Sequence, residues 1–346
     1  MSHIKFDPIP DDSDRVRLMQ DRMFVFQKFV RSKPDGYVMN ANYVEYAPKT
    51  DNLEIRDDDI FIITYPRSGT TWCQEMLWCI AHNVDLEGAK ETLLKRSPFW
   101  EYDALLPPGG VEVIPPEIMA MLFGNQSSDD PATFGKHIEF LQKCPSPRVI
   151  KTHLPLSLLP PKVKEKARIV YCARHPKDNV VSFYQLFKSV SSFVGTFEEF
   201  ADLYVNDLMM WGPQGQHVLE HWKLRDTLPN LLFLTFEEMK SDIEGVINRV
   251  SKHLEVGLTK DQIAQLKDHL SFESMQNNPA VSFEESFSTF TSNFVHSLQN
   301  KQVQFYTKGK VGGWRSAFNP ELNDAFNQYI EKYYKDTDLP YEPDDL

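Results

Sequence analysis

Four short apolar runs, separated by segments of helical character, most strongly constrain the fold of this chain. Each run is continuous rather than alternating in polarity, which is typical of parallel strands that helices cover on both faces. The runs are DIFIITY (59–65), RVIKTH (148–153), ARIVYCAR (167–174) and NLLFLTF (230–236). Helical segments such as 70–82 and 176–187 lie between them. Strands that alternate with helices predict an α/β fold with a central, mainly parallel sheet flanked by helices.

Two longer segments interrupt this alternation. Residues 96–147 are rich in Pro, Gly, Met and Phe, and residues 277–313 are also irregular, before a final helix expected over 320–335. We interpret both as substrate-pocket or lid insertions, because long loops in compact domains are usually functional. No shift in composition marks a boundary, so we expect one domain that spans 1–346.

Charge and composition exclude several classes of function. Lys and Arg total 37 against 49 for Asp and Glu, so neither nucleic acid nor an anionic membrane is an expected partner. The start of the chain lacks a signal-peptide pattern, and no run approaches the roughly 18 apolar residues of a membrane helix, so we expect a cytoplasmic protein. The cysteines form no CxxC pair and are expected to be reduced structural thiols. They are Cys73, Cys79, Cys144 and Cys172.

The stretch YPRSGTTW (65–72) joins the first apolar run to the helix expected after it. At such a junction the start of a helix offers unpaired N–H groups to an anion. Gly69 permits close approach of the backbone, and Arg67 adds a fixed charge. Further hydroxyl donors are Ser68, Thr70 and Thr71. The loop predicts a site for a phosphate or an isosteric group, although a capped helix start without a ligand explains such a string about equally well.

Two further pairs of residues belong to the same edge of the predicted sheet. Arg174 stands at a strand end, and Ser182 lies about two turns into the next helix, where the two could share an anion. An exposed arginine and a surface serine are the simpler interpretation. Lys151 and His153 project from one face of a strand, where they could stabilise charge and move a proton. A solvated lysine and a hydrogen-bonded histidine fit that spacing equally well.

Four motifs together resemble the cytosolic sulfotransferase family. They are YPRSGTTW (65–72), KTHLP (151–155), ARHPKDNVVSFY (173–184) and TKGKVGGW (307–314). Their order and separations are similar to those of the family. KTHLPLSLLPP and the insertion before it also resemble insect members, retinol dehydratase among them. The resemblance implies a P-loop-like sulfotransferase fold and a role in xenobiotic or hormone metabolism.

The activity that this resemblance implies is transfer of a sulfuryl group from 3′-phosphoadenylyl sulfate to an alcohol. The acceptor is a small hydrophobic molecule with a hydroxyl group, such as a phenol, a steroid or another alcohol, and the product of the donor is adenosine 3′,5′-bisphosphate. His153 is the implied general base, while Lys151 and Arg67 balance charge on the sulfuryl group and the leaving phosphate. In-line transfer needs a base near pH 7 and cations, which these residue types supply, and no metal is expected.

The resemblance also implies which residues hold the donor. The loop from Arg67 to Trp72 holds the 5′-phosphosulfate, with the indole against the adenine, while Arg174 and Ser182 hold the 3′-phosphate. Further contacts to the nucleotide come from Phe236, Ser271, Phe272, Met275, Thr307, Lys308 and Gly309.

Several positions depart from the family pattern. Arg67 stands where lysine is usual, which puts the rate in doubt, and Thr307 stands where an arginine contacts the 3′-phosphate, which puts the cofactor affinity in doubt. Phe236 replaces a tyrosine, and Gly313 replaces an aspartate. The segment RSAFNPELND (315–324) matches the family's dimer motif poorly, so a homodimer is only weakly implied.

Four other functions fit parts of the sequence. HVLEH (217–221) has the HxxEH pattern of a zinc hydrolase, although two histidines on a helix surface are the simpler interpretation. A P-loop kinase would use Glu237 after a Walker-B-like strand, but no lysine follows Gly69. A non-catalytic binder, or a dehydratase that sulfates an alcohol and then eliminates sulfate, would use the same apolar pocket. Candidate pocket residues, most of which could equally be core, are Phe99, Trp100, Tyr102, Phe183, Tyr184, Phe187, Phe290 and Phe294.

Overall fold

The computed structural model describes residues 4–10, 12–23, 28–105, 136–189, 193–281, 309–341 and 343. Much of both predicted insertions therefore lies outside the described residues. The same holds for four candidate site residues, which are Phe290, Phe294, Thr307 and Lys308.

Four parallel strands form the central sheet, in the order β5-β4-β6-β7. They are β4 (Ile60–Thr64), β5 (Val149–Thr152), β6 (Arg168–Ala173) and β7 (Leu231–Thr235). Each strand lies within one of the four apolar runs, so all four strand predictions are confirmed. All five residues of β4 are buried, which explains why its sequence is continuously apolar.

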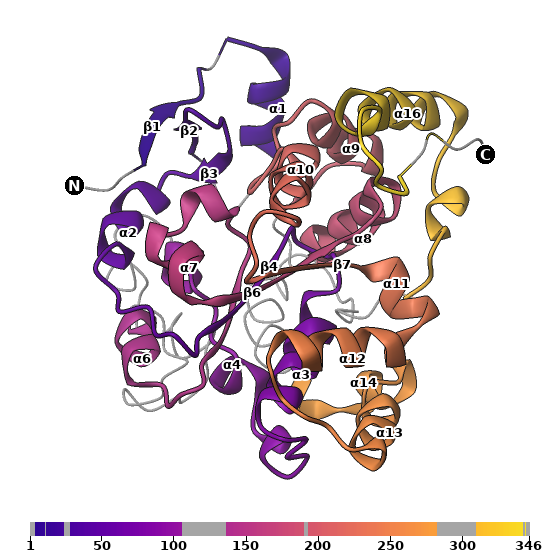
Figure 1. Ribbon diagram of the computed structural model, residues 1–346. Coiled ribbons are helices and arrows are strands. Elements are labelled where there is room, and N and C mark those ends of the chain that lie inside the picture. The colour runs from indigo at the N-terminus through magenta and orange to yellow at the C-terminus, as the bar shows by residue number, and fades with distance from the viewer. Residues whose placement is uncertain are drawn as a thin grey trace.

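Helices cover both faces of this sheet because successive strand side chains point to opposite sides. In β4, Ile60 and Ile62 join one hydrophobic cluster, and Phe61 and Ile63 join the other. On the first side lie α3 (Thr70–Ala81), α12 (Ile243–His253), α13 (Lys260–His269) and α14 (Phe272–Asn277). On the second side, uppermost in Figure 1, lie α8 (Pro176–Ser189), α9 (Phe197–Val205), α10 (Gln214–Leu224) and α16 (Pro320–Tyr334). The predicted α/β class and the final helix are confirmed.

An antiparallel sheet near the N-terminus was not expected from the sequence. Its strands are β1 (Lys5–Pro8), β2 (Phe29–Lys33) and β3 (Val38–Asn40), in that spatial order. The remaining α-helices of the described residues are α1 (Asp14–Arg22), α2 (Tyr43–Thr50), α4 (Leu93–Arg96), α6 (His137–Lys143), α7 (Pro161–Lys166) and α11 (Phe236–Ser241). Short 3-10 helices are η1 (Gly88–Lys90), η2 (Tyr102–Leu105), η4 (Leu156–Leu158), η5 (Pro279–Val281) and η6 (Gly313–Ser316).

The thiols agree with one composition-based expectation. All four cysteines are buried and free, as expected for reduced structural thiols. Within the part of the chain that the structure describes, no helix combines the length and apolar character needed to cross a membrane.

Candidate active site

The loop between β4 and α3 forms the floor of the site. Gly69 caps α3 with a φ of 95°, a left-handed conformation that favours glycine. A Cβ atom at this position would lie 3.0 Å from the Phe236 ring, so the loop also passes α11 closely. Arg67 has a φ of 68°, although it carries a side chain. The first turn of α3 follows directly, and its N–H groups lack carbonyl partners within the helix. This geometry is that of an anion-binding helix start.

Asn179 on α8 holds this loop in place. Its Nδ2 donates to the carbonyl of Pro66 at 2.8 Å and to Oγ of Ser68 at 3.1 Å. The Ser68 side chain is fully buried, so its hydroxyl is a structural part of the loop rather than a wall of the cavity. Sequence reasoning missed Asn179, although it lies inside the quoted motif ARHPKDNVVSFY.

The two predicted anion sites touch each other. Arg174 donates to the backbone carbonyl of Arg67 at 3.0 Å, and Arg67 Nε donates to Oγ of Ser182 at 3.0 Å. The guanidinium of Arg174 also lies over the Phe236 ring, 4.4 Å from its centroid. Nε of Arg174 is buried without a hydrogen-bond partner among the described residues. A buried charged donor of this kind needs an acceptor, so this wall of the site fits an anionic group.

Hydrogen bonding fixes the tautomer of His153. Its Nδ1 lies 2.8 Å from the carbonyl of Thr64, which can only accept, so Nδ1 carries the proton. In the neutral ring, Nε2 then keeps a lone pair, and it has no hydrogen bond to any residue that the structure describes. Burial lowers the pKa of His153 well below its usual value, and the neighbouring charge of Lys151 lowers it further. The imidazole is therefore neutral at pH 7 and available as a base.

Lys151 and Glu101 form a second titratable pair beside this histidine. Burial lowers the pKa of Lys151 to about 8; Arg67 lowers it too, while Glu101 acts in the opposite direction. Burial raises the pKa of Glu101 to about 7, against the hydrogen bonds from Thr152 and the backbone of His153. Near neutral pH the site therefore keeps a cationic lysine beside a neutral histidine.

Trp72 and the segment after α13 contribute a further wall of the site. The indole Nε1 donates to the carbonyl of Leu270 at 3.0 Å, and the ring meets Phe236 edge-on at 5.9 Å. Phe272, which lines the same cavity as Trp72, is 41 % exposed, so much of its ring surface is uncovered. These flat rings provide an environment suited to a nucleobase.

One cavity brings most of the predicted residues together. Its lining includes Arg67, Gly69, Thr70, Thr71, Trp72, Lys151, His153, Arg174, Ser182, Phe236, Phe272, Met275 and Gly309. Its apolar end includes the predicted Phe99, Tyr102, Phe183 and Phe187, together with Leu94, Leu105, Leu186, Met210 and Trp211, which the sequence did not indicate.

Besides Ser68, three predicted side chains among the described residues lie outside the lining of this cavity. Trp100, expected in the substrate pocket, is instead a core residue that packs on Phe61 with ring centroids 5.4 Å apart. Ser271 caps α14 by accepting from the backbone N–H of Ser274 at 3.2 Å. Tyr184 donates to the carbonyl of Gly195 at 3.2 Å.

The HxxEH histidines do not form a zinc site. His217 Nε2 lies 3.0 Å from the carbonyl of His153, so it donates there, and its Nδ1 accepts from the hydroxyl of Tyr171 at 2.8 Å. Both nitrogens of His217 are thus occupied, and Glu220 accepts from Tyr37 and Ser157 instead. The expectation of two surface histidines is also wrong, because His217 and His221 are fully buried. Burial is the main cause that lowers both pKa values to about 3.

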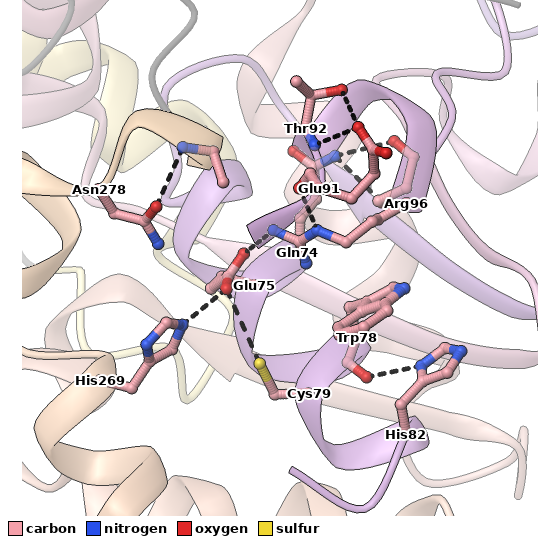
Figure 2. Close-up of polar contacts among 12 residues, drawn as sticks. Gln74, Glu75, Trp78, Cys79, His82, Glu91, Thr92, Arg96, His269 and Asn278 are labelled. Carbon is pink, nitrogen blue, oxygen red and sulfur yellow. Dashed lines mark hydrogen bonds and ion pairs between the residues drawn. The ribbon is translucent and has the colours of Figure 1, made fainter. Parts of the chain in front are cut away.

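Within the described ranges, one other group could present three metal ligands, namely Glu75, Cys79 and His269. Figure 2 shows that Glu75 instead lies between two nitrogen donors, His269 Nε2 at 2.7 Å and Arg96 at 2.6 Å. A guanidinium next to the carboxylate competes with a cation, so we interpret this group as a buried ion-pair network.

The fold and the site define an α/β protein with the geometry of an anion site at the carboxyl edge of a parallel sheet, beside apolar residues of the same cavity. A family model described as "Sulfotransferase domain" matches residues 57–338, and the chain belongs to this family. It is similar to the luciferin sulfotransferase of Photinus pyralis, with 33 % identity over 308 residues, which is 88 % of this chain and 79 % of that protein. It is also 29 % identical to Homo sapiens sulfotransferase 1E1 over 328 residues, which is 93 % of this chain and 99 % of that protein.

A solved structure of retinol dehydratase in a complex with retinol and PAP resembles the whole described fold. The TM-score is 0.83 at 28 % identity, over 99 % of this chain and 100 % of that chain. A second structure of that protein, with androsterone and PAP, matches equally well. The predicted resemblance to this family and to retinol dehydratase is confirmed, and the protein is an enzyme of the sulfuryl-transfer class.

Proposed function

We propose that the protein transfers a sulfuryl group from 3′-phosphoadenylyl sulfate to a hydroxyl of a small apolar acceptor, with His153 as general base. One observation carries this proposal: His153 lines the cavity as a neutral ring with Nδ1–H bound to Thr64. Nε2 is then the atom that accepts the hydroxyl proton, since it is the nitrogen with a lone pair.

The residues present fit the nucleotide donor. Its 5′ end fits the loop from Arg67 to Thr71 and the start of α3. The buried, unpartnered Nε of Arg174 fits the 3′-phosphate together with Ser182. The donor supplies an activated sulfuryl group on a phosphate leaving group. The PAP found with retinol dehydratase, adenosine 3′,5′-bisphosphate, supports this assignment.

Two cations of the chain act on charge at the reacting end. Lys151 and Arg67 line the cavity, and Lys151 lies 4.2 Å from the centre of the Phe99 ring. As positioned charges in a largely buried site, they stabilise negative charge that develops on the leaving phosphate. The imidazole of His153 makes T-shaped contacts with the rings of Phe99 and Trp211, each with its ring centre 5.3 Å away, and these apolar neighbours limit the access of water to the base.

The apolar end of the cavity indicates the class of acceptor. Its walls are aromatic and aliphatic, so an extended hydrophobic alcohol or phenol fits better than a sugar or a peptide. The retinol and androsterone in the retinol dehydratase structures are both of this chemical kind.

A second candidate is sulfation followed by elimination of sulfate. The similarity to retinol dehydratase at a TM-score of 0.83 favours it over a nucleotide kinase or a non-catalytic binder. In that case the sulfate ester is an intermediate, and the final product is an alkene with one water less than the alcohol.

The test is an acceptor panel of 2-naphthol, androsterone and retinol assayed with ³⁵S-labelled donor. We expect label to move to at least one acceptor, in the presence of a metal chelator. Mass spectrometry of the retinol reaction distinguishes a sulfate ester from a dehydrated product. Turnover of ATP with Mg²⁺, and no transfer of label to any acceptor, would favour the kinase instead.

A further inference from the structure

The edge of the central sheet continues beyond β5 into the segment Pro98–Glu101. The backbone N–H of Lys151 donates to the carbonyl of Pro98 at 2.9 Å, and that of Trp100 donates to the carbonyl of Lys151 at 2.8 Å. Phe99 and Lys151 are therefore paired as in a parallel ladder. In such a ladder the next bond joins the N–H of His153 to the carbonyl of Trp100.

Side chains replace the backbone partners at His153. The carbonyl of Trp100 accepts from the hydroxyl of Tyr46, so the ladder stops there. The N–H of His153 donates instead to Oε1 of Glu101 at 2.7 Å. The carbonyl of His153 accepts from Nε2–H of His217 at 3.0 Å. Both backbone groups of the residue that we assign as the base are thus held by buried side chains.

Each of these two side chains is itself fixed by a second contact. Oε2 of Glu101 accepts from the hydroxyl of Thr152 at 2.7 Å, and Glu101 is only 1 % exposed. Nδ1 of His217 accepts from Tyr171, a residue of the central strand β6. These contacts fix the position of His153 relative to the core of the sheet, although His153 lies just beyond the last residue of β5.

We propose that Glu101 and His217 are positioning residues that clamp the main chain of His153 and so aim its imidazole at the acceptor hydroxyl. This inference rests on the proposed function, because it takes His153 as the base. Glu101 has a second effect through its charge. It is the acidic group that acts on Lys151, whereas Arg67 opposes the protonated lysine. The neutral His153 and His217 add no charge near neutral pH.

Two substitutions separate position from charge at Glu101. Glu101→Gln keeps the length and a carbonyl acceptor for the N–H of His153 but removes the charge, so the pKa of Lys151 should fall below its wild-type value of about 8. Glu101→Asp keeps the charge but shortens the reach, so kcat should fall by about 100-fold, as a misplacement near 1 Å commonly produces.

His217 provides an independent arm of the same test. His217→Phe removes the donor to the carbonyl of His153, whereas His217→Gln keeps a donor N–H. We expect kcat to fall in the Phe variant and to recover in part in the Gln variant. The pKa of Lys151 should stay unchanged in both, because His217 is uncharged at working pH.

The measurements are the kcat–pH profile with 2-naphthol, androsterone and retinol, and the pKa of Lys151 from trace acetylation read by mass spectrometry. Binding of adenosine 3′,5′-bisphosphate, measured by calorimetry, reports an intact fold and is expected to match the wild type. Glu220→Asp is the matched control for Glu101→Asp, because Glu220 also accepts a backbone N–H, from Ser157 at 2.6 Å, and a hydroxyl, from Tyr37 at 2.7 Å.

Wild-type kcat in the Glu101→Asp variant would overturn the clamp, and a wild-type pKa of Lys151 in Glu101→Gln would overturn the charge effect of Glu101. An equal loss of kcat in Glu220→Asp would also overturn the clamp, since the effect would then be one of general packing. Failure of the proposed function has a different signature. In that case His153→Ala keeps full turnover, while the pKa of Lys151 still reports on the charge of Glu101.

Discussion

At the scale of single residues, Arg174 combines burial with an unmade hydrogen bond. Because a charge-assisted hydrogen bond contributes about 1.5 to 3 kcal/mol, Arg174→Ala should weaken adenosine 3′,5′-bisphosphate binding by about 10- to 100-fold. Adenosine 5′-monophosphate, which lacks the 3′-phosphate, should bind nearly as before. Calorimetry with both nucleotides measures this, and Arg15→Ala, an exposed arginine, is the control. Equal losses for the two nucleotides would remove Arg174 from the 3′-phosphate site.

A second prediction about a single residue is that Lys151 sets the alkaline limit of activity. Burial lowers its pKa to about 8, so the lysine is charged below that pH and loses its charge as the pH rises through it. We expect kcat to decline above about pH 8. Arginine stays protonated throughout this range, so Lys151→Arg should show a lower kcat without this decline. If kcat of Lys151→Arg still declined near pH 8, the decline would belong to another titrating group.

At the scale of elements, a buried ion-pair network joins α3, the helix that follows the loop from Arg67 to Gly69, to α4 and α13. Glu75 on α3 contacts Arg96 and His269, as Figure 2 shows. Arg96→Met leaves the carboxylate without its buried partner, which should lower the free energy of unfolding by about 3 to 5 kcal/mol in urea titrations. Arg249→Met, which breaks the exposed pair with Glu238, should cost less than about 1 kcal/mol. Similar costs for both variants would contradict a structural role for the network.

The pH dependence of that network has a defined sign. Burial alone would raise the pKa of Glu75, but the hydrogen bond from His269 and the charge of Arg96 lower it overall. A lowered carboxyl pKa stabilises the fold above the unfolded-state pKa, and this contribution is lost as the pH falls through the folded-state value. The difference in stability between the wild type and Arg96→Met should therefore shrink in acid. A constant difference would show that Glu75 is not the group involved.

Much of the element scale could be predicted from the sequence, and the reasons are local. The strand from Ile60 to Thr64 is buried on both sides, so its apolar run was visible, and Gly69 marked the turn after it. The N-terminal sheet was missed because its strands are short and mixed in polarity, as in KFDP and FVRSK. Its edges pair with distant backbone, for example Val38 with Trp211, which no local pattern reports.

The candidate site was predictable to a similar degree. His153, Lys151 and Arg174 lie at strand ends and could be placed on one edge from the sequence. Glu101 lies in a segment without periodicity, and its role depends on a contact with His153, a residue 52 positions away. Trp100 lies in the same segment and was misassigned. Its neighbour Phe99 lines the cavity, whereas the Trp100 ring packs on Phe61 in the core.

At the scale of the whole molecule, residues from three strand-to-helix junctions meet at one edge of the sheet. A ligand that bridges them should stabilise the entire fold, and we propose that the chain behaves as one domain. Adenosine 3′,5′-bisphosphate at about 100 times its dissociation constant should add about 2.7 kcal/mol and raise Tm. Thermal unfolding with this nucleotide and with ATP plus Mg²⁺ measures the effect. A larger shift with ATP and Mg²⁺ would contradict the assignment of the site.

The most direct test of the account is a comparison of His153→Ala with the wild type in two assays, sulfuryl transfer from labelled donor and calorimetric binding of adenosine 3′,5′-bisphosphate. Removal of the base should abolish transfer to every acceptor that the wild type uses, because no other described side chain offers a neutral nitrogen at that point of the cavity. Nucleotide affinity should remain close to that of the wild type, since we assign His153 to the acceptor hydroxyl and not to the phosphates. Full transfer activity in His153→Ala would contradict the central claim.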